Sequence, residues 1–129
     1  MPLMKIDIIK GRKKSEMKQI LDIAYETMLT AFDAPIGDRY QIVTQHEDYE
    51  MEILGTGLGV ERTDGVIIFT IITRPRTQQQ KVQFYSEIVN ELHDKLNIRK
   101  EDVMFSVIEN TDEDWSFFKG EAQFLNGSL

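Results

Sequence analysis

The chain has 129 residues, of which 41% are hydrophobic, and 15 Lys and Arg against 22 Asp and Glu give it a formal net charge of −7. This size and composition predict one globular domain, and the acidic balance without a long basic run excludes a broad nucleic-acid interface. Cysteine is absent, which excludes disulfides, thiolate metal sites and a cysteine nucleophile.

The apolar segments are short. The longest, Val66–Ile72, has seven residues, whereas a helix needs about 20 to cross a bilayer. The first residues lack a basic segment followed by a long apolar one, so we expect no secretory signal and no membrane partner. The cytoplasm is the expected location.

The first half of the chain predicts a strand, a helix and another strand. A β-branched segment predicts the first strand from Leu3 to Ile9, and Ser15 is the predicted N-cap of the helix. Apolar residues then recur at three- and four-residue spacing over about five turns. They are Met17, Ile20, Leu21, Ala24, Tyr25, Met28, Leu29 and Phe32. The second strand is expected from Tyr40 to Thr44, and a weaker extended segment from Glu50 to Leu54.

The second half predicts the same succession. The run Val66–Ile72 is typical of a central strand buried on both faces. Thr77 and Gln80 have the spacing of a capping box that begins a helix, and Asn97 is its predicted left-handed end. The apolar stripe of this helix consists of Phe84, Tyr85, Ile88, Val89, Leu92 and Leu96. Alternation from Val103 to Ile108 predicts the last strand.

The two halves form an internal repeat. Ile8 and Ile71 are 63 positions apart, and Ile20 and Phe84 are 64 apart. Two β-α-β units with right-handed crossovers give an α+β fold, a four-stranded sheet with two helices on one face. The expected divisions of this single domain are residues 1–62, 63–109 and a C-terminal tail, 110–129. The second sheet face then needs a cover, for which we expect another copy of the chain in a closed homo-oligomer.

Arg74-Pro75-Arg76 is the clearest candidate for a binding site. The two arginines follow the end of the most apolar strand and precede the positive N-terminal end of a helix. Their guanidinium groups could therefore both bind one carboxylate. The alternative is a pair of surface arginines that offset the acidic charge. Arg12-Lys13-Lys14 occupies the matching position in the first unit, and we expect it to be solvated.

Pro2 is the second candidate. Removal of the initiator methionine before a small residue would expose it as a secondary amine. Ordinary α-amino groups titrate near ~8, and a proline amine is intrinsically somewhat more basic. Burial or nearby cations lower such a pKa, so the amine could act as a base, a nucleophile or a cation. The alternative is a proline without a role.

The remaining motifs carry little chemistry. Gly55-Thr56-Gly57-Leu58-Gly59 lacks the spacing of a nucleotide-binding loop, so a flexible loop is expected. His46 and His93 lack partners at metal-ligand spacing. We therefore expect neither a metal nor a cofactor. The aromatic residues of the tail predict an ordered segment rather than a free terminus.

Several short segments along the chain form a recognisable set. They are Pro2-Leu3, Gly11-Arg12, Asp38-Arg39-Tyr40-Gln41, Gln45-His46, Thr56-Gly57-Leu58-Gly59, Arg74-Pro75-Arg76, Gln80-Lys81-Val82, Phe84-Tyr85, Glu109-Asn110 and Asp114-Trp115-Ser116-Phe117. Each segment is weak by itself, but their order and spacing extend over nearly the whole chain. With Pro2 before a strand, the β-α-β duplication and the arginine pair, the chain resembles the tautomerase superfamily, whose members use an amino-terminal proline. The short segments resemble, more narrowly, the malonate semialdehyde decarboxylase family.

The resemblance implies a trimer with a site for a small carboxylate substrate. It implies that Pro2 is catalytic, that Arg74 and Arg76 bind the carboxylate, and that Asp38 tunes the proline or positions a water. It also implies that an aromatic wall shields the substrate from water. The residues matching this wall are Trp115, Phe117 and Phe124.

The expected reaction is decarboxylation of a 3-oxo acid, with possible hydratase activity. Protonated Pro2 would stabilise the developing enolate, or Pro2 would form a Schiff base with the aldehyde. One alternative is a tautomerase of enol-pyruvate-type 2-oxo acids with neutral Pro2 as general base. The other is a carboxylate-binding trimer without catalysis. The pKa of Pro2 separates the first two.

Overall fold

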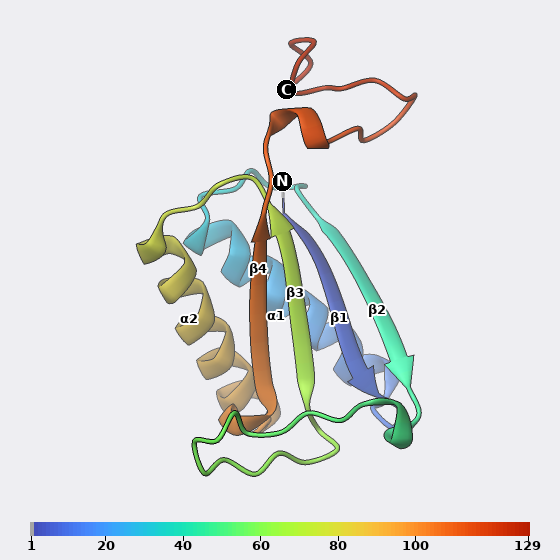
Figure 1. Cartoon of the computed structure of the whole chain (residues 1–129), viewed down its shortest axis with the longest axis vertical. Helices are drawn as coiled ribbons and strands as arrows, with labels where there is room; N and C mark the ends of the chain where they lie inside the picture. The colour runs from blue at the N-terminus through green and yellow to red at the C-terminus, as the bar shows by residue number, and fades with distance from the viewer. Residues whose placement is uncertain (1) are drawn as a thin grey trace.

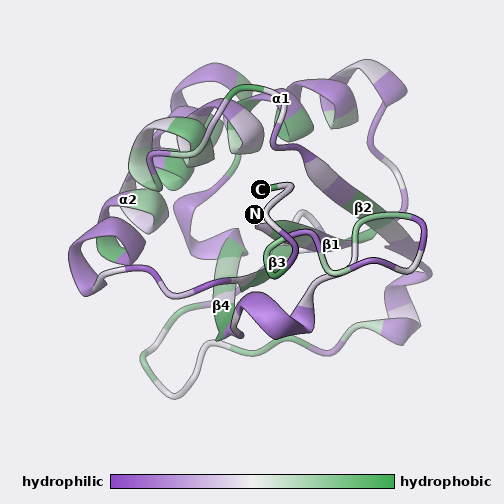
Figure 2. Cartoon of the chain, turned by 90° about the horizontal axis from the view of Figure 1, so that it is seen from above, coloured by the Kyte–Doolittle hydropathy of each residue, from purple (hydrophilic) through white to green (hydrophobic). Residues whose placement is uncertain are grey.

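A computed structural model describes residues 2–129 as a four-stranded mixed sheet covered on one face by two helices. The strands are β1 (Leu3–Ile9), β2 (Tyr40–His46), β3 (Ile67–Thr73) and β4 (Val103–Glu109), and the helices are α1 (Lys14–Ala31) and α2 (Gln78–Leu96). The strand order is β2-β1-β3-β4, with β1 and β3 antiparallel at the centre and the outer pairs parallel. The predicted α+β sheet of two β-α-β units is confirmed (Figures 1 and 2).

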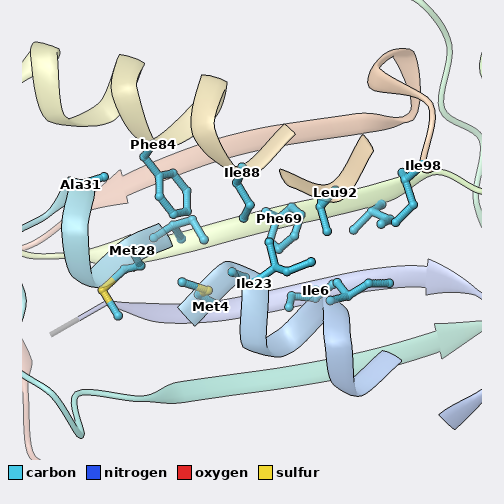
Figure 3. Packing of buried hydrophobic residues seen from close by; sticks show 14 of the residues in the cluster. Met4, Ile6, Ile23, Met28, Ala31, Phe69, Phe84, Ile88, Leu92 and Ile98 are labelled. Carbon is cyan, nitrogen blue, oxygen red and sulfur yellow. The ribbon is translucent and has the colours of Figure 1, made fainter. Parts of the chain in front are cut away.

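The core lies between the sheet and the helices. Met4, Ile6 and Ile8 alternate along β1, as the two-residue period of a strand requires, and all are buried. Phe69 of β3 stacks on Phe105 of β4 with ring centroids 5.1 Å apart. Figure 3 shows the helical side chains that pack onto these strands. Buried members from the helices are Ile20, Ile23, Ala24, Met28, Ala31, Phe84, Ile88 and Leu92.

The start of α2 agrees with the sequence prediction. The Gln80 backbone N–H donates to Thr77 Oγ1 at 3.1 Å, and the Thr77 backbone N–H donates to Gln80 Oε1 at 2.9 Å. Asn97 ends the helix in the left-handed region with φ 55°. The predicted capping box and terminator are both confirmed.

The start of α1 differs from the prediction. The N-cap is Lys13 rather than Ser15, and no side chain caps the helix. Arg12, expected to be solvated, is half-buried, and its Nη2 donates to the Gly65 carbonyl at 2.5 Å. This tertiary contact fixes the chain just before the helix, so helical geometry begins two residues earlier than side-chain capping predicts. Lys13 and Lys14 are exposed, as expected.

Three strands also differ in extent from the prediction, among them β4, which ends at Glu109 instead of Ile108. β2 continues to His46, and β3 covers residues 67–73 instead of 66–72. The predicted extended segment from Glu50 to Leu54 is not a strand: a short 3₁₀ turn, Asp48–Glu50, begins a long loop at the sheet end opposite the N-terminus. In β3 the core-facing residues are buried, whereas Ile68, Thr70 and Ile72 are half-buried on the other face. The expected burial on both faces is therefore incomplete in one chain.

Within residues 2–129 no helix is long and apolar enough to cross a membrane.

Candidate active site

The predicted site residues lie together at one edge of the sheet, the one formed by the strand ends where β1 and β2 begin and β3 ends. Leu3 at the start of β1 is opposite Tyr40, at the start of β2, and Ile72, near the end of β3. Asp38, which precedes β2, and Arg74, which follows β3, therefore lie beyond the same edge as Pro2. The chain after β4 leaves from this edge too, since the Asn110 backbone N–H donates to the Thr73 carbonyl at 2.9 Å. Figure 1 shows the C-terminal tail above the N-terminus.

Pro2 is buried at the entrance to β1. It is the first residue that the structure describes, and Met1 lies outside the described residues. Strand pairing on both sides of Leu3 fixes the direction in which the chain enters the sheet.

Asp38 lies in the turn between α1 and β2 and is only 4% exposed. The Gly37 backbone N–H donates to the Tyr25 hydroxyl at 2.7 Å, and the Asp38 N–H donates to the Pro35 carbonyl at 3.1 Å. Gly37 has φ 92°, a conformation that favours glycine. Tyr25 of α1 thus fastens the turn that carries the carboxylate.

Burial raises the pKa of Asp38 above its ordinary value, because desolvation disfavours the charged form. Nearby positive charges, those of Arg76 and Arg74 among them, act in the opposite direction. The site therefore holds a buried carboxyl group within the field of two guanidinium groups.

Arg74 is held by the C-terminal tail. Its Nη1 donates to Asp112 Oδ1 at 3.0 Å, and its Cζ lies 3.7 Å from the centroid of the Phe124 ring, a cation–π contact. Its Nε is buried and has no hydrogen-bond partner among the described residues. One donor of this guanidinium group is therefore not used by the described residues.

Arg76 is held by the body of the domain. Its Nε donates to Thr73 Oγ1 at 3.1 Å, and its Nη1 donates to the Phe32 carbonyl at 2.9 Å. Burial lowers the pKa of Arg76, the charge of Arg74 lowers it further, and Asp38 opposes both effects. The expected pair of neighbouring arginines is present, but each has a different anchor.

The tail forms an aromatic cluster. The Phe117 ring lies 5.4 Å from Trp115, 5.5 Å from Phe124 and 5.5 Å from Tyr40, measured between centroids. Trp115 Nε1 donates to Asn110 Oδ1 at 2.7 Å, which fixes the indole. The three aromatic residues singled out in the sequence therefore lie together and touch Arg74 through Phe124.

Three residues of this region have no role in the sequence prediction: Tyr40, Asp112 and Gln123. Tyr40 is recognisable only as the first residue of a strand, and Asp112 is one of several acidic residues in the tail. The contacts of Tyr40 with Phe117 and of Asp112 with Arg74 join segments far apart in the chain, so no local spacing identifies these two residues. Gln123 bonds to the backbone of Phe117 and Phe118 across a turn of the tail, and no sequence motif marks that turn.

The histidines and acidic groups make no site of their own. His46 Nε2 lies 2.7 Å from Asp7 Oδ1 on the open face of the sheet, and exposed His93 has Nδ1 3.1 Å from the Ile98 carbonyl oxygen. Across the described part of the chain, no group of three His, Asp or Glu residues is placed to hold a metal ion.

The arrangement has a clear chemical capacity. Two guanidinium groups can bind a small carboxylate, and the aromatic cluster can exclude water from it, which strengthens charge interactions. A buried carboxyl near them can accept a proton or orient a polar group.

Comparisons with known proteins bear on this site. A family model described as "Tautomerase enzyme" matches residues 38–118. The probable tautomerase YrdN of Bacillus subtilis (strain 168) is 41% identical over 129 residues, which covers 100% of both chains.

Solved structures agree with both matches. A malonate semialdehyde decarboxylase, whose crystal structures were described as a basis for decarboxylase and hydratase activities, shares 43% identity and a TM-score of 0.95 over 98% of each chain. A fused 4-OT described as a symmetric trimer has 14% identity and a TM-score of 0.77, over 96% of this chain and 98% of that chain. At that identity it shows a common fold alone.

Proposed function

The chain belongs to the tautomerase family of enzymes, and we propose that it is an amino-terminal-proline enzyme that decarboxylates a small 3-oxo acid such as malonate semialdehyde. The observation that carries this proposal is the gathering of Asp38, Arg74 and Arg76 at the sheet edge where Pro2 enters β1. The 43% identity to a malonate semialdehyde decarboxylase supports this choice among family reactions.

Arg74 and Arg76 bind the substrate carboxylate in this proposal. Arg76 is immobilised by Thr73 and the Phe32 carbonyl, and Arg74 keeps its buried Nε free to donate. Two anchored guanidinium groups can hold the carboxylate out of the plane of the carbonyl group, the geometry that aligns the breaking bond with the carbonyl π system.

Pro2 stabilises the charge that develops. Once Met1 is removed, the Pro2 nitrogen is a secondary amine, and in its protonated form it can donate to the carbonyl oxygen. The bond to the carboxylate carbon breaks, carbon dioxide leaves, and the electron pair moves to that oxygen as an enolate. A proton then reaches the enolate carbon and gives the aldehyde. In the covalent variant, Pro2 adds to the aldehyde and water leaves to form an iminium ion, which takes up the electron pair instead and becomes an enamine. The enamine carbon then takes up a proton, and water hydrolyses the iminium ion to release the aldehyde and free Pro2.

Asp38 and the aromatic cluster support this step. The Asp38 carboxylate favours the protonated form of a neighbouring amine, or positions a water molecule for hydratase activity. The wall of Trp115, Phe117 and Phe124 keeps bulk water from the enolate, so that interactions with Pro2 and the arginines act in a less polar medium.

The second candidate is isomerisation of an enol-pyruvate-type acid with neutral Pro2 as general base. Two observations favour it: the relative YrdN is named a probable tautomerase, and the nearby guanidinium charges lower the pKa of an amine. The same residues bind the carboxylate in both reactions, so only the protonation state of Pro2 and the products distinguish them.

We also propose a homotrimer. On the sheet face opposite the helices, Ile42 and Ile108 are 52% and 51% exposed. The fold neighbour with 14% identity is described as a symmetric trimer. Association of three such faces would bury this apolar surface.

The first test determines the state of Pro2. Intact mass shows whether Met1 is removed, and NMR titration of a ¹⁵N-labelled Pro2 amine gives its pKa. Release of carbon dioxide from malonate semialdehyde with an amine pKa well above neutral supports the decarboxylase. An amine pKa below neutral with conversion of enol-pyruvates supports the tautomerase. Retained Met1, with binding but no turnover, would leave a carboxylate-binding protein and overturn the enzymatic proposal.

The arginines provide a second arm of this test. Arg74→Lys keeps the charge but loses the planar donor pair, so kcat/KM is expected to fall by about 10- to 100-fold, mainly through KM. Arg99→Lys is the matched control, because Arg99 is exposed and its contacts are with Glu61, Glu101 and Asp102, away from this edge. Equal kinetics of the two variants would remove Arg74 from the site.

A further inference from the structure

The tail contains one buried amide that the proposed mechanism does not use. The Gln123 side chain is 1% exposed. Its Oε1 accepts a hydrogen bond from the Phe117 backbone N–H at 2.8 Å, and its Nε2 donates to the Phe118 backbone carbonyl at 2.9 Å. The buried amide thus uses both its acceptor and its donor on the backbone of Phe117 and Phe118. The Phe118 carbonyl also accepts from the Glu121 backbone N–H at 3.2 Å.

These bonds close a tight loop. Lys119 and Gly120 have φ of 58° and 68°, left-handed conformations that reverse the chain between Phe118 and Gln123. The left-handed region disfavours a lysine, so this turn needs support from contacts around it. The Gln123 carbonyl also accepts the Leu129 backbone N–H at 3.1 Å. Gln123 is therefore bonded both to the beginning of the loop and to the chain that follows it.

The loop determines where the aromatic rings lie. Phe117 is bonded directly to the Gln123 side chain and contacts Trp115, Tyr40 and Phe124. Phe124 follows Gln123 in the chain and lies 3.7 Å from Arg74 Cζ. The Gln123 amide consequently fixes the position of Phe117 relative to Phe124, the ring that contacts Arg74.

We propose that Gln123 is a positioning residue that assembles the aromatic wall before any substrate binds. The wall is then a preformed side of the site and not a lid that closes over the ligand. The effect on catalysis rests on the proposed function, whereas the assembly of the wall is measurable without a substrate.

Trp115 provides that measurement, because it is the single tryptophan of the chain and stacks on Phe117. Gln123→Met keeps a long side chain and loses both hydrogen bonds. We expect its Trp115 emission to shift to the red and to become more accessible to acrylamide, with far-UV circular dichroism unchanged. We expect kcat/KM for malonate semialdehyde to fall by about 10- to 100-fold, since small displacements of a positioning group have effects of this size.

Gln123→Glu gives a sharper variant. The carboxylate can accept from the Phe117 N–H, but it donates to the Phe118 carbonyl only when protonated. Burial raises the pKa of a carboxyl group. At pH of about 8 this variant should therefore resemble Gln123→Met, and it should approach the wild type as the pH falls to about 5.5. The ratio of variant to wild-type kcat/KM at each pH cancels the titration of Asp38, Pro2 and the exposed neighbours Lys119 and Glu121.

Gln19→Glu is the matched control, because Gln19 is exposed in α1, and it should show no change in either signal. Wild-type Trp115 emission and quenching in Gln123→Met would overturn the assembly of the wall by this amide. Altered fluorescence with unchanged kcat/KM would overturn the positioning role. If the wild type does not turn over a 3-oxo acid, the proposed reaction fails, and the fluorescence still decides whether Gln123 assembles the wall.

Discussion

At the residue scale, burial of Asp38 costs stability, although the proposed reaction uses this carboxyl group. Its carboxyl is buried, and the protein holds its pKa above the ordinary value. The folded state therefore binds this proton more tightly than the unfolded state does. By linkage, the contribution of Asp38 to stability is most favourable below the ordinary pKa of 3.8 and decreases as the pH rises through the folded pKa.

Asp38→Asn should reveal both effects. The amide does not ionise, so we expect a higher melting temperature than the wild type at neutral pH. The difference should shrink as the pH falls toward 3.8. Decarboxylase activity should fall by about 100-fold or more, as expected for loss of a general acid–base or charge-tuning group. Thermal unfolding across pH and steady-state kinetics measure the two.

The control for Asp38→Asn is Asp64→Asn, at an exposed carboxyl in the turn before β3. A loss of stability in Asp38→Asn at neutral pH would contradict the prediction, since it would mean that the ionised carboxylate gains more from its surroundings than burial costs it.

Asp38 and the aromatic wall were named from the resemblance, and the roles of all the site residues remain proposals. Residue types and spacing identified Arg74 and Arg76 as an anion site next to a helix start, with an equal alternative on the surface. Asp112 and Gln123 could not be found in this way, because each acts through a contact that depends on the path of the tail. Arg12 shows the reverse error: a basic tripeptide gives no sign that one member donates to a distant carbonyl.

At the element scale, α2 begins directly beside the site. The capping box of Thr77 and Gln80 follows Arg76 without an intervening residue. The cap therefore stabilises the helix and also fixes where the arginine leaves the backbone.

Thr77→Ala removes the side-chain acceptor and should cost about 1 kcal/mol of unfolding free energy. The melting temperature should fall by about 4 °C for a domain of this size. Thr77→Ser keeps the hydroxyl and should recover most of the loss. Equal destabilisation by Ala and Ser in calorimetry would show that the methyl group, and not the hydrogen bond, matters.

Elements defined by local chemistry were predictable, and those defined by distant contacts were not. The bounds of β1 and both ends of α2 follow from β-branching, a capping box and Asn97. The start of α1 depends on Arg12 reaching Gly65. The segment from Glu50 to Leu54 has the composition of a strand but lies in a loop beyond the sheet end, where no neighbouring strand offers hydrogen bonds.

At the scale of the whole molecule, the two sheet faces are unlike. Both helices cover one face (Figure 2), and the other keeps half-exposed apolar residues on the outer strands. A monomer would leave this apolar surface in water. The proposed trimer would therefore complete the burial of the sheet.

Ile42→Lys tests the association. In the proposed trimer a lysine on this face would be an unpaired charge within the contact, so we expect the association constant to fall by at least about tenfold. Val82→Lys is the control, since Val82 is equally exposed, at 56%, but lies on α2. Sedimentation velocity over a dilution series measures both. Identical distributions for the two variants would place the contact elsewhere.

The repeat was the most reliable guide to the architecture. The recurrence of Ile8 at Ile71 and of Ile20 at Phe84 predicted two β-α-β units and one helical layer, because equivalent residues of the two units should pack into the same core. The antiparallel contact of β1 with β3 could not be read from these spacings, because it depends on how the two units meet.

Repetition also gives the subunit two equivalent strand-to-helix junctions, with Arg12 in the first unit at the place of Arg76 in the second. Burial lowers the pKa of both guanidinium groups. Arg12, however, is occupied by the Gly65 carbonyl, and the loop around it is fastened by the Thr63 backbone N–H donating to Asp102 Oδ1 at 2.8 Å. Arg76 likewise donates to a backbone carbonyl, that of Phe32, but beside it Arg74 has a buried Nε with no hydrogen-bond partner among the described residues. The molecule should therefore take up one ligand per subunit, at the second junction, a stoichiometry half that of its internal symmetry.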